Sequence, residues 1–364
     1  MKAEHRWVLE TLGADGAEEA DLDEAFRHLA REEERDGPRD AHGRFPFAAS
    51  TLDPLDPPLE RLRASLGVEP PRWFGAKFAV ALTHDVDVVW RWTRRGVKGA
   101  LWRARHGDLR QLADLARLPA HRLRGTDPWW RFRELVDEER SRGARSTFFL
   151  LGGHHAPEDG PDWGPLRAYL VETLRELGVE IALHPSYLAA RHPALLAEEK
   201  HALEELAGPV EGSRYHYLRV EPHANLVPLA ELGLRYDSSV GWAGEIGFRA
   251  GTTHPYRPWD PVRAAPLDLV ELPVAVMDAT LAEERYLGLS VAAAERRLHG
   301  LLEAAEAFGG GFSVIWHTER FDPATARGWD GLYFRLIDEI HARGGVCVSA
   351  GELAAEARSR LSGR

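Results

Sequence analysis

The chain alternates between short apolar runs and amphipathic helical patterns, and this alternation limits its fold more than any other feature. The apolar runs are "FAVALTHDVD", "RSTFFLLG", "VEIALHPS", "GSRYHYLRV", "LRYDSSV", "LVELPVAVM", "FSVIWHT" and "GVCVSAG". Helical segments such as "PLRAYLVETLRELG" and "SVAAAERRLHGLLEAAEAFGG" lie between them, and several end in glycine, as helices often do. Repeated β-α units of this kind predict a largely parallel sheet covered by helices.

The repeats extend over residues 77–357, which makes room for seven or eight units and predicts an α/β fold, a (β/α)7-8 barrel. An open, doubly wound sheet is the alternative, because a sequence does not show whether a sheet closes. Residues 1–76 form an N-terminal, mostly helical extension in this interpretation. Within it, Leu22, Phe26 and Leu29 recur at helical spacing in a strongly acidic stretch, which predicts a short amphipathic helix.

Composition excludes several classes of protein. The 364 residues contain no apolar run near the roughly 18 residues that a membrane span needs. The first residues meet charge at once and lack the apolar run of a secretory signal, so we expect a cytoplasmic protein. The single cysteine, Cys347, rules out an internal disulfide and is expected to be buried. A formal net charge of −11 argues against general binding of nucleic acid.

Ionisable side chains stand where the apolar strands end. The carboxyl ends of parallel barrel strands share one face, on which active sites are built. Buried charges at those ends are costly unless they are paired or coordinate an ion. We therefore expect a functional site there, formed from Asp85, Asp87, His184, His216, Asp237 and His317.

The stretch "THDVD" places two carboxylates on one face of a strand, because side chains alternate along it. Asp85 and Asp87 point the same way, while His84 and Val86 point the other way. Two adjacent carboxylates repel unless a cation lies between them, so one is expected to bind a divalent metal and the other to act as a base. An aspartate pair that caps the following segment is the structural alternative.

Two histidines at strand ends likewise have a functional and a structural interpretation. His184 in "VEIALHPSY" could complete a metal site with a carboxylate, or it could be a loop or cap residue. His317 in "IWHTERF" is suitably placed for a general acid, or it could be a hydrogen-bonded core histidine.

Taken together, "ALTHDVD", "STFFLLG", "EIALHPSY", "GSRYHYLR", "RYDSS" and "VIWHT" resemble the motifs of the polysaccharide deacetylase family in order and approximate spacing, over roughly residues 77–357. Members of that family are metal-dependent amidohydrolases that act on N-acetylated sugars, and they fold as an irregular (β/α) barrel. The resemblance therefore implies a carbohydrate or glycan-precursor substrate and a divalent metal.

The resemblance also implies roles for individual residues. Asp85 corresponds to the base and Asp87 to the metal-binding aspartate of the family's first motif, with His184 as a second ligand. Arg214 corresponds to the arginine that orients the base, and a structural salt bridge is its alternative role. Asp237 would pair with that arginine or with the histidine acid, or it would form an Asx turn at a strand end.

Two positions depart from the family pattern. Val86 separates the two aspartates, which are usually adjacent, so their roles could be exchanged. The second motif usually carries two histidines four residues apart, but Leu188 stands four residues after His184. We choose His216 as the third metal ligand because it follows the next predicted strand. The weaker candidates for that ligand are His154, His155 and His192.

Three aromatic residues could contact a sugar. A backbone N–H near Tyr217 would help to hold the oxyanion of the intermediate. Trp242 and Phe248 could form a platform for a pyranose ring, or they could anchor loops on the barrel.

The resemblance implies that the protein is a metal-dependent hydrolase that removes an N-acetyl group in surface polysaccharide assembly. A carboxylate and two imidazoles as ligands favour Zn²⁺ as its metal. Asp85 would take a proton from the attacking water, and His317 would protonate the departing amine. The alternatives are hydrolysis of another C–N amide, such as a cyclic ureide or formamide, and a non-catalytic carbohydrate-binding barrel.

A basic insertion at residues 91–124 interrupts the repeats. It contains ten basic and two acidic side chains, a formal charge of +8, with Trp92 and Trp102 among them and Trp90 directly before it. It could bind phosphate or anionic sugars, or lie on an anionic membrane surface. The alternative is a solvated helical excursion that packs against the acidic N-terminal region.

Overall fold

The central strand of the molecule is β1 (Ala79–Val86), which is buried along its whole length. In the computed structural model, which describes residues 1–362, β1 pairs in parallel with β2 (Ser146–Leu151) on one side and with β10 (Gly311–Ile315) on the other. The short strand β11 (Val346–Val348) pairs in parallel with the first residues of β1. The motif "THDVD" therefore ends the most enclosed strand of the sheet.

The sheet continues from β2 through β3 (Glu180–His184) and β4 (Gly212–Ser213) to β5 (Tyr236–Asp237). Two further strands, β8 (Val270–Glu271) and β9 (Val274–Met277), are parts of one run that Leu272 and Pro273 interrupt. Because β8 pairs with β5 and β9 pairs with β10, this run joins the two edges of the sheet. The predicted irregular (β/α) barrel is confirmed, and the open doubly wound sheet is not formed.

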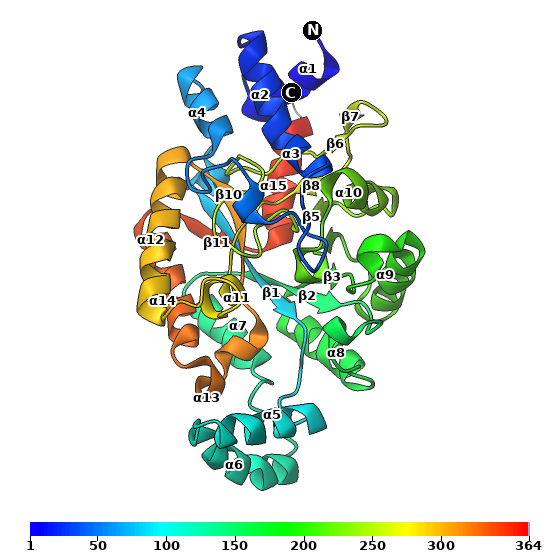
Figure 1. Cartoon of the computed structure of the whole chain (residues 1–364), viewed down its shortest axis with the longest axis vertical. Coiled ribbons are helices and arrows are strands. Elements are labelled where there is room, and N and C mark those ends of the chain that lie inside the picture. Colours follow the sequence, from blue (N-terminus) through cyan, green and yellow to red (C-terminus); the bar gives the residue numbers. More distant parts are fainter. Residues whose placement is uncertain (363–364) are drawn as a thin grey trace.

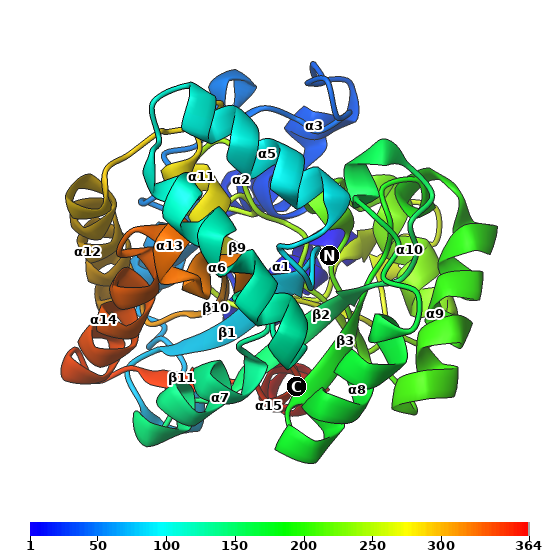
Figure 2. The same cartoon turned by 90° about the horizontal axis from the view of Figure 1, so that it is seen from below.

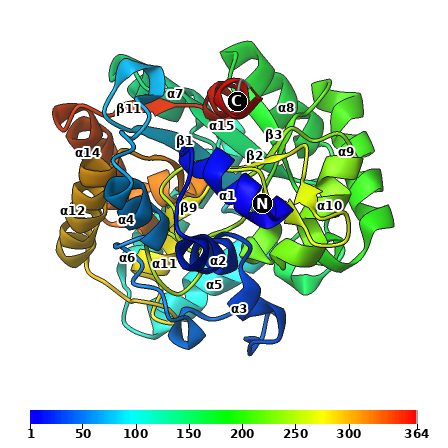
Figure 3. The ribbon, with the colours of Figure 1, turned by 90° about the horizontal axis from the view of Figure 1, so that it is seen from above.

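Helices surround the barrel in an outer ring, which Figure 3 shows from above. Those expected from the sequence patterns are α7 (Phe132–Ser141), α8 (Leu166–Leu177), α9 (Pro193–Ala207), α12 (Val291–Phe308) and α14 (Trp329–Ala342). The chain also forms α10 (Pro222–Glu231), α11 (Asp278–Ala282), α13 (Pro323–Ala326) and α15 (Ala350–Ser362), and a small antiparallel pair, β6 (Trp259–Asp260) and β7 (Ala265–Pro266). Their apolar faces pack on the strands and bury Cys347, as expected.

The N-terminal extension is helical, as predicted, and packs on the barrel at one end of the molecule (Figure 1). Its helices are α1 (Ala3–Leu12), α2 (Glu19–Leu29), α3 (Glu32–Arg35) and α4 (Pro58–Ser65). The predicted amphipathic helix corresponds to α2 and buries Leu22 and Leu29. It ends before α3 because Arg31 adopts a left-handed backbone conformation, with φ of 58°.

Buried ion pairs hold the extension in place. Glu34 receives two hydrogen bonds from Arg249, the Nε bond at 2.8 Å, and a third from Arg31. Burial raises the pKa of the Glu34 carboxyl, but the positive charges of Arg249 and Arg31 outweigh this effect and lower the pKa to about 2. Glu60 has a similar site, where His254 and Arg63 outweigh burial and lower its pKa to about 2.

The basic insertion folds as a hairpin of two helices, α5 (Arg94–Arg105) and α6 (Arg110–Arg124), at the other end of the molecule. The expectation that it packs against the acidic N-terminal region is therefore wrong (Figure 1). Its ion-pair partners come from elsewhere: Arg91 pairs with Asp322, and Asp108 pairs with Arg327. Among the described residues, no helix combines the length and the apolar character needed to cross a membrane.

Candidate metal centre

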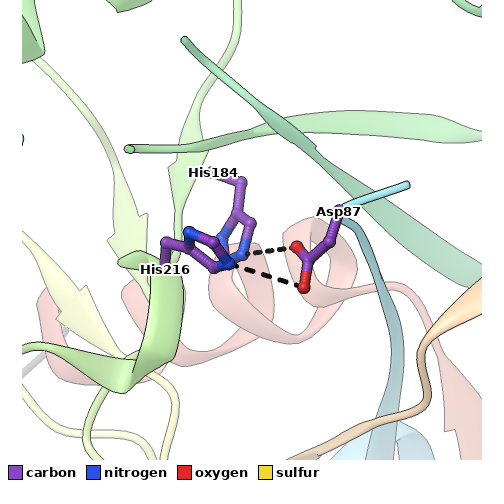
Figure 4. A group of neighbouring side chains, drawn as sticks. All are labelled: Asp87, His184 and His216. Carbon is purple, nitrogen blue, oxygen red and sulfur yellow. Dashed lines mark ion pairs between the residues drawn. The ribbon is translucent and has the colours of Figure 1, made fainter. Parts of the chain in front are cut away.

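Three side chains from three strand ends converge on one point, as Figure 4 shows. Asp87 follows β1, His184 ends β3, and His216 lies in a short turn three residues after β4. The Nε2 atoms of His184 and His216 lie 3.4 Å and 3.5 Å from the two carboxylate oxygens of Asp87. One possible ligand atom from each residue lies within 4.8 Å of the other two, which is close enough to share one cation.

Hydrogen bonds fix both imidazole rings with the same atom facing inward. His184 contacts the carbonyl oxygen of Arg214 through Nδ1 at 2.5 Å, and His216 contacts Asp159 through Nδ1 at 3.0 Å. Each ring therefore donates its Nδ1 proton outward and turns its Nε2 atom toward Asp87, as metal-binding histidines turn it toward their cation. The Asp87 Oδ1 atom is buried without a hydrogen-bond partner in the described part of the chain. These residues fit a divalent cation, since two imidazoles and a carboxylate are a common donor set for Zn²⁺.

The charges at the centre are mutually dependent. Burial raises the pKa of Asp87, but the charge of His216 and the closeness of both ligand histidines outweigh it and hold the pKa well below its ordinary value. For His216, burial lowers the pKa, but Asp87 and Asp159 outweigh burial and raise it to about 9. A divalent cation would replace the proton that stabilises these carboxylates.

Asp85 has a different partner from Asp87. Its Oδ1 atom accepts a hydrogen bond from Arg214 Nη1 at 2.7 Å, and its Oδ2 atom lies 3.8 Å from His184 Nε2. Arg214 is fully buried, spans the barrel interior, and lies over the ring of Phe149. Its other hydrogen bonds go to Thr83, Ser238 and Ser313. The Arg214 guanidinium therefore fixes one carboxylate oxygen of Asp85, while the other oxygen faces the centre.

His317 also approaches Asp87, with its Nε2 atom 3.7 Å from Oδ2. Its Nδ1 atom lies 2.5 Å from Asp278 Oδ1, and Asp278 also pairs with Arg320. Burial lowers the pKa of His317, but the Asp278 carboxylate outweighs it and raises the pKa well above the usual value. The imidazole is thus held as a proton donor at the wall of the pocket.

His84 points away from the centre, as the strand alternation predicts. It is fully buried, with Nδ1 2.7 Å from the carbonyl oxygen of Trp316 and Nε2 2.8 Å from Glu139. Its ring packs on Phe148 and Tyr333. It supports the strand that carries both aspartates.

The predicted pairing of Asp237 is wrong. In the described part of the chain, Asp237 accepts a hydrogen bond from Ser213 at 2.7 Å and stands opposite Glu271 in the β5–β8 pair, and it bonds directly to neither Arg214 nor His317. Arg214 has already engaged its donors with Asp85 and with hydroxyl and carbonyl groups. Burial raises the pKa of Asp237, and burial together with the neighbouring Asp237 carboxyl raises the pKa of Glu271 well above its ordinary value.

Trp242 and Phe248 are buried, with 2% and 0% of their surface exposed. Trp242 packs on Phe45 and Phe47 of the N-terminal extension, and Phe248 packs on Phe312. Neither side chain lines the pocket. Trp242 and Phe248 are therefore loop anchors, as in the alternative interpretation, and they do not form the sugar platform.

The pocket over the centre is a cavity of about 110 Å³. Tyr217 forms part of its wall, and Tyr217 and Leu218 have φ angles of 62° and 52°, a left-handed conformation that residues other than glycine rarely adopt. Arg44 of the extension also lines the pocket and donates from Nη1 to the Tyr217 carbonyl at 2.9 Å. Residues 1–76, in which the sequence showed no sign of catalysis, thus contribute to the pocket.

Several other residues of the site were not predicted. Asp278 follows the apolar run "LPVAVM", the same signal that identified Asp87, and could have been found in this way. Asp159 lies in the loop "HHAPEDG", which has no such signal. Glu319 lines the pocket with its Oε2 atom buried and unpaired among the described residues, and burial raises its pKa to about 7.

The weaker ligand candidates do not join the centre. His154 contacts the carbonyl of Asp159, His155 lies 3.3 Å from Glu199, and His192 precedes α9. Leu188, at the position of the family's second histidine, is partly exposed. The group that could hold a metal ion is completed by His216, which a different strand end supplies.

Comparisons with known proteins found similarity to solved structures at the level of the fold. No protein-family model matches the sequence, and no curated protein matches it. A solved structure from Mycobacterium smegmatis, described as a polysaccharide deacetylase, is 21% identical, with a TM-score of 0.54, over 80% of this chain and 94% of its own. The structure of Puue allantoinase is 14% identical, with a TM-score of 0.51, over 85% of this chain and 98% of its own. This chain therefore has the same barrel fold as those two proteins.

Proposed function

We propose that this chain is a metal-dependent hydrolase that removes an N-acetyl group from a sugar or glycan precursor, in the assembly of surface polysaccharide. One observation carries the proposal: Asp87, His184 and His216 converge beside a carboxylate that Arg214 holds and a histidine that Asp278 holds. The motif resemblance and the shared barrel fold support the same reaction class.

A cation at Asp87, His184 and His216, with Zn²⁺ the ion that this donor set favours, would supply a Lewis acid that acidifies water and polarises an amide carbonyl. Asp85 accepts the proton of the attacking water on Oδ2, while Arg214 keeps the carboxylate oriented through Oδ1. The ion pair with Arg214 makes Asp85 the poorer metal ligand, which favours the base role for Asp85 and the ligand role for Asp87.

His317 is the proposed general acid. Its Nε2 atom faces the centre and protonates the departing amine nitrogen, and Asp278 holds the ring through Nδ1. A backbone N–H in the left-handed turn at Tyr217 would help to hold the developing oxyanion.

Two measurements test the proposal. Elemental analysis of the purified protein should find a divalent metal that His216→Ala loses and that His192→Ala retains. Acetate should then be released from a panel of N-acetylated sugars. Full metal occupancy in His216→Ala would contradict the ligand set, and a metal-loaded protein that releases no acetate from any sugar would contradict the substrate class.

Hydrolysis of another C–N amide is the second candidate. The barrel is shared with an allantoinase as well as with a deacetylase, so a cyclic ureide is the substrate to test in parallel. Turnover of allantoin without acetate release would favour this candidate. The non-catalytic alternative, a barrel that only binds carbohydrate, does not account for the converging charged groups, which are costly to bury without a function.

A further inference from the structure

The α5–α6 hairpin carries apolar side chains on its outer surface. The exposed fractions are 61% for Trp102, 67% for Leu109 and 90% for Leu123, and about half for both Leu101 and Leu112. Figures 1 and 2 show both helices side by side at the end of the molecule opposite to α1 and α2. Large apolar side chains on a surface helix usually face the protein interior.

The face that α6 turns inward is polar instead. Gln111 and Asp114, three residues apart on one face of the helix, are buried, and Arg91 bonds to them at 3.1 Å and 3.0 Å. Leu112 and Leu123 are eleven residues apart, which returns them to the same opposite face. The buried ion pair therefore fixes α6 with its leucines pointing outward.

The hairpin is also cationic. Seven of its exposed basic side chains form no ion pair with any residue that the structure describes; they are Arg94, Lys98, Arg103, Arg105, Arg110, Arg122 and Arg124. They lie in the same two helices as the apolar residues, in a segment with a formal charge of +8 within a chain of −11. Apolar and basic side chains together match the interface of an anionic bilayer, where each basic residue contributes about 1 kcal/mol.

A cavity lies beside the hairpin and adjoins the pocket over the metal centre. Its volume is about 750 Å³, and Gly96, Gly99 and Arg103 of α5 line it together with Trp90 and Trp129. Four residues line both this cavity and the pocket over the metal centre; they are Glu158, Tyr217, Glu319 and Arg320. The cavity beside the hairpin and the pocket over Asp87 are therefore neighbours that share part of their walls.

We propose that the α5–α6 hairpin docks the protein on an anionic lipid bilayer and that the substrate is the N-acylated sugar headgroup of a membrane lipid. The second part rests on the proposed function, because it names the class of sugar that reaches the metal centre. The larger cavity holds the headgroup, while the lipid chains stay in the bilayer beneath Trp102 and Leu112.

Sedimentation with vesicles tests the docking. The full chain should bind phosphatidylcholine vesicles that contain phosphatidylglycerol and should bind pure phosphatidylcholine vesicles more weakly. A triple variant, Leu101→Ser, Trp102→Ser and Leu112→Ser, should lose at least about tenfold in affinity, because it withdraws three large apolar side chains from the bilayer. The control is Val262→Ser with Tyr169→Ser, which alters apolar residues that are exposed elsewhere. Equal affinity of the triple variant and the control would overturn the proposal.

A second readout separates this proposal from the proposed function. The unmodified chain is also assayed for acetate release from soluble N,N′-diacetylchitobiose. Acetate release without vesicle binding would overturn the docking and leave the deacetylase function standing. Vesicle binding without hydrolysis of any soluble or lipid-linked N-acetyl sugar would support the docking and overturn the substrate class.

Discussion

The Arg44 guanidinium donates a hydrogen bond from Nη1 to the carbonyl oxygen of Tyr217 at 2.9 Å, across 173 positions of the chain. Through this contact, a segment that precedes the barrel holds a strained turn in the wall of the metal pocket. A left-handed non-glycine residue costs on the order of 1–3 kcal/mol and persists only where its surroundings fix it. Tyr217 is fixed by Arg44 on one side and by the ring of His216 on the other.

Arg44→Met should therefore lower kcat/KM for acetate release by about tenfold or more, because the Tyr217 turn relaxes once its carbonyl loses a charged donor. Bound metal should stay unchanged, since Arg44 contacts none of the three ligands. Arg61→Met, which removes an exposed arginine of the same extension, is the matched control. Equal kinetics for the two variants would show that Arg44 has no role in the pocket.

Asp159 should tune the metal affinity through His216. Asp159→Asn should weaken metal binding by about 10- to 100-fold, as the loss of a carboxylate behind a metal-binding histidine does. Asp162→Asn is the control in the same loop, because Asp162 accepts a hydrogen bond from the Gly164 backbone and does not contact His216. Competition with a chelator measures the affinity, and identical values for both variants would contradict the role of Asp159.

His317→Gln should reduce kcat by about 10²- to 10⁴-fold with little change in KM, since its proton is needed only as the C–N bond breaks. Asp278→Asn should cause a smaller loss of kcat because the imidazole stays in place without its carboxylate partner. His299→Gln, on the exposed surface of α12, is the control. A rise in KM alone would assign His317 to substrate binding.

Glu34 should make stability depend on pH in the acid range. Its pKa is about 2 in the folded protein against an ordinary 4.5, so its stabilising contribution is fully present above about 4.5 and is lost as the pH falls toward about 2. That contribution is about 3 kcal/mol at neutral pH. Urea unfolding across this pH range should show a flatter dependence for Glu34→Gln than for Glu32→Gln, and parallel curves would contradict the assignment.

Trp242→Phe should lower the thermal midpoint and leave KM for a sugar substrate unchanged, because the Trp242 ring packs between the extension and the barrel. The expected loss is on the order of 1–3 kcal/mol, as for other large core side chains that are shortened or reshaped. A raised KM with unchanged stability would restore Trp242 as a sugar contact.

The barrel was predictable because its signal is local. Apolar runs with polar ends and glycine-terminated helices recur along the chain, and their positions agree with the strands and helices observed. The stretch "GSRYHYLRV" was not predictable in this way, since only Gly212 and Ser213 form a strand. Tyr217 and Leu218 adopt left-handed backbone angles, and neither is a glycine, the residue that usually indicates such angles in a sequence. His216 therefore lies in a turn and not on the strand that was expected.

The residues that surround the candidate metal centre were less predictable from the sequence than the residues that form it. Four of its residues stand at or just beyond strand ends, where polarity after an apolar run is visible in the sequence; they are Asp85, Asp87, His184 and His216. Arg44 and Asp159 reach the site through contacts that bridge 173 and 57 positions, and no local pattern encodes them. Asp237 has the right pattern but a different partner, since the same strand-end signal does not indicate which side of the barrel a side chain faces.

The ion pair between Glu34 and Arg249 also has a consequence for synthesis. The two residues are 215 positions apart, and Trp7 is 250 positions from the carbonyl of Arg257 to which it donates. At 5–20 residues per second, a ribosome needs about 10 to 40 s between Glu34 and Arg249. Throughout that interval, the nascent N-terminal helices lack the partners that bury their charge and their tryptophan. Newly made chains should therefore depend on chaperones until Arg249 and Arg257 have emerged.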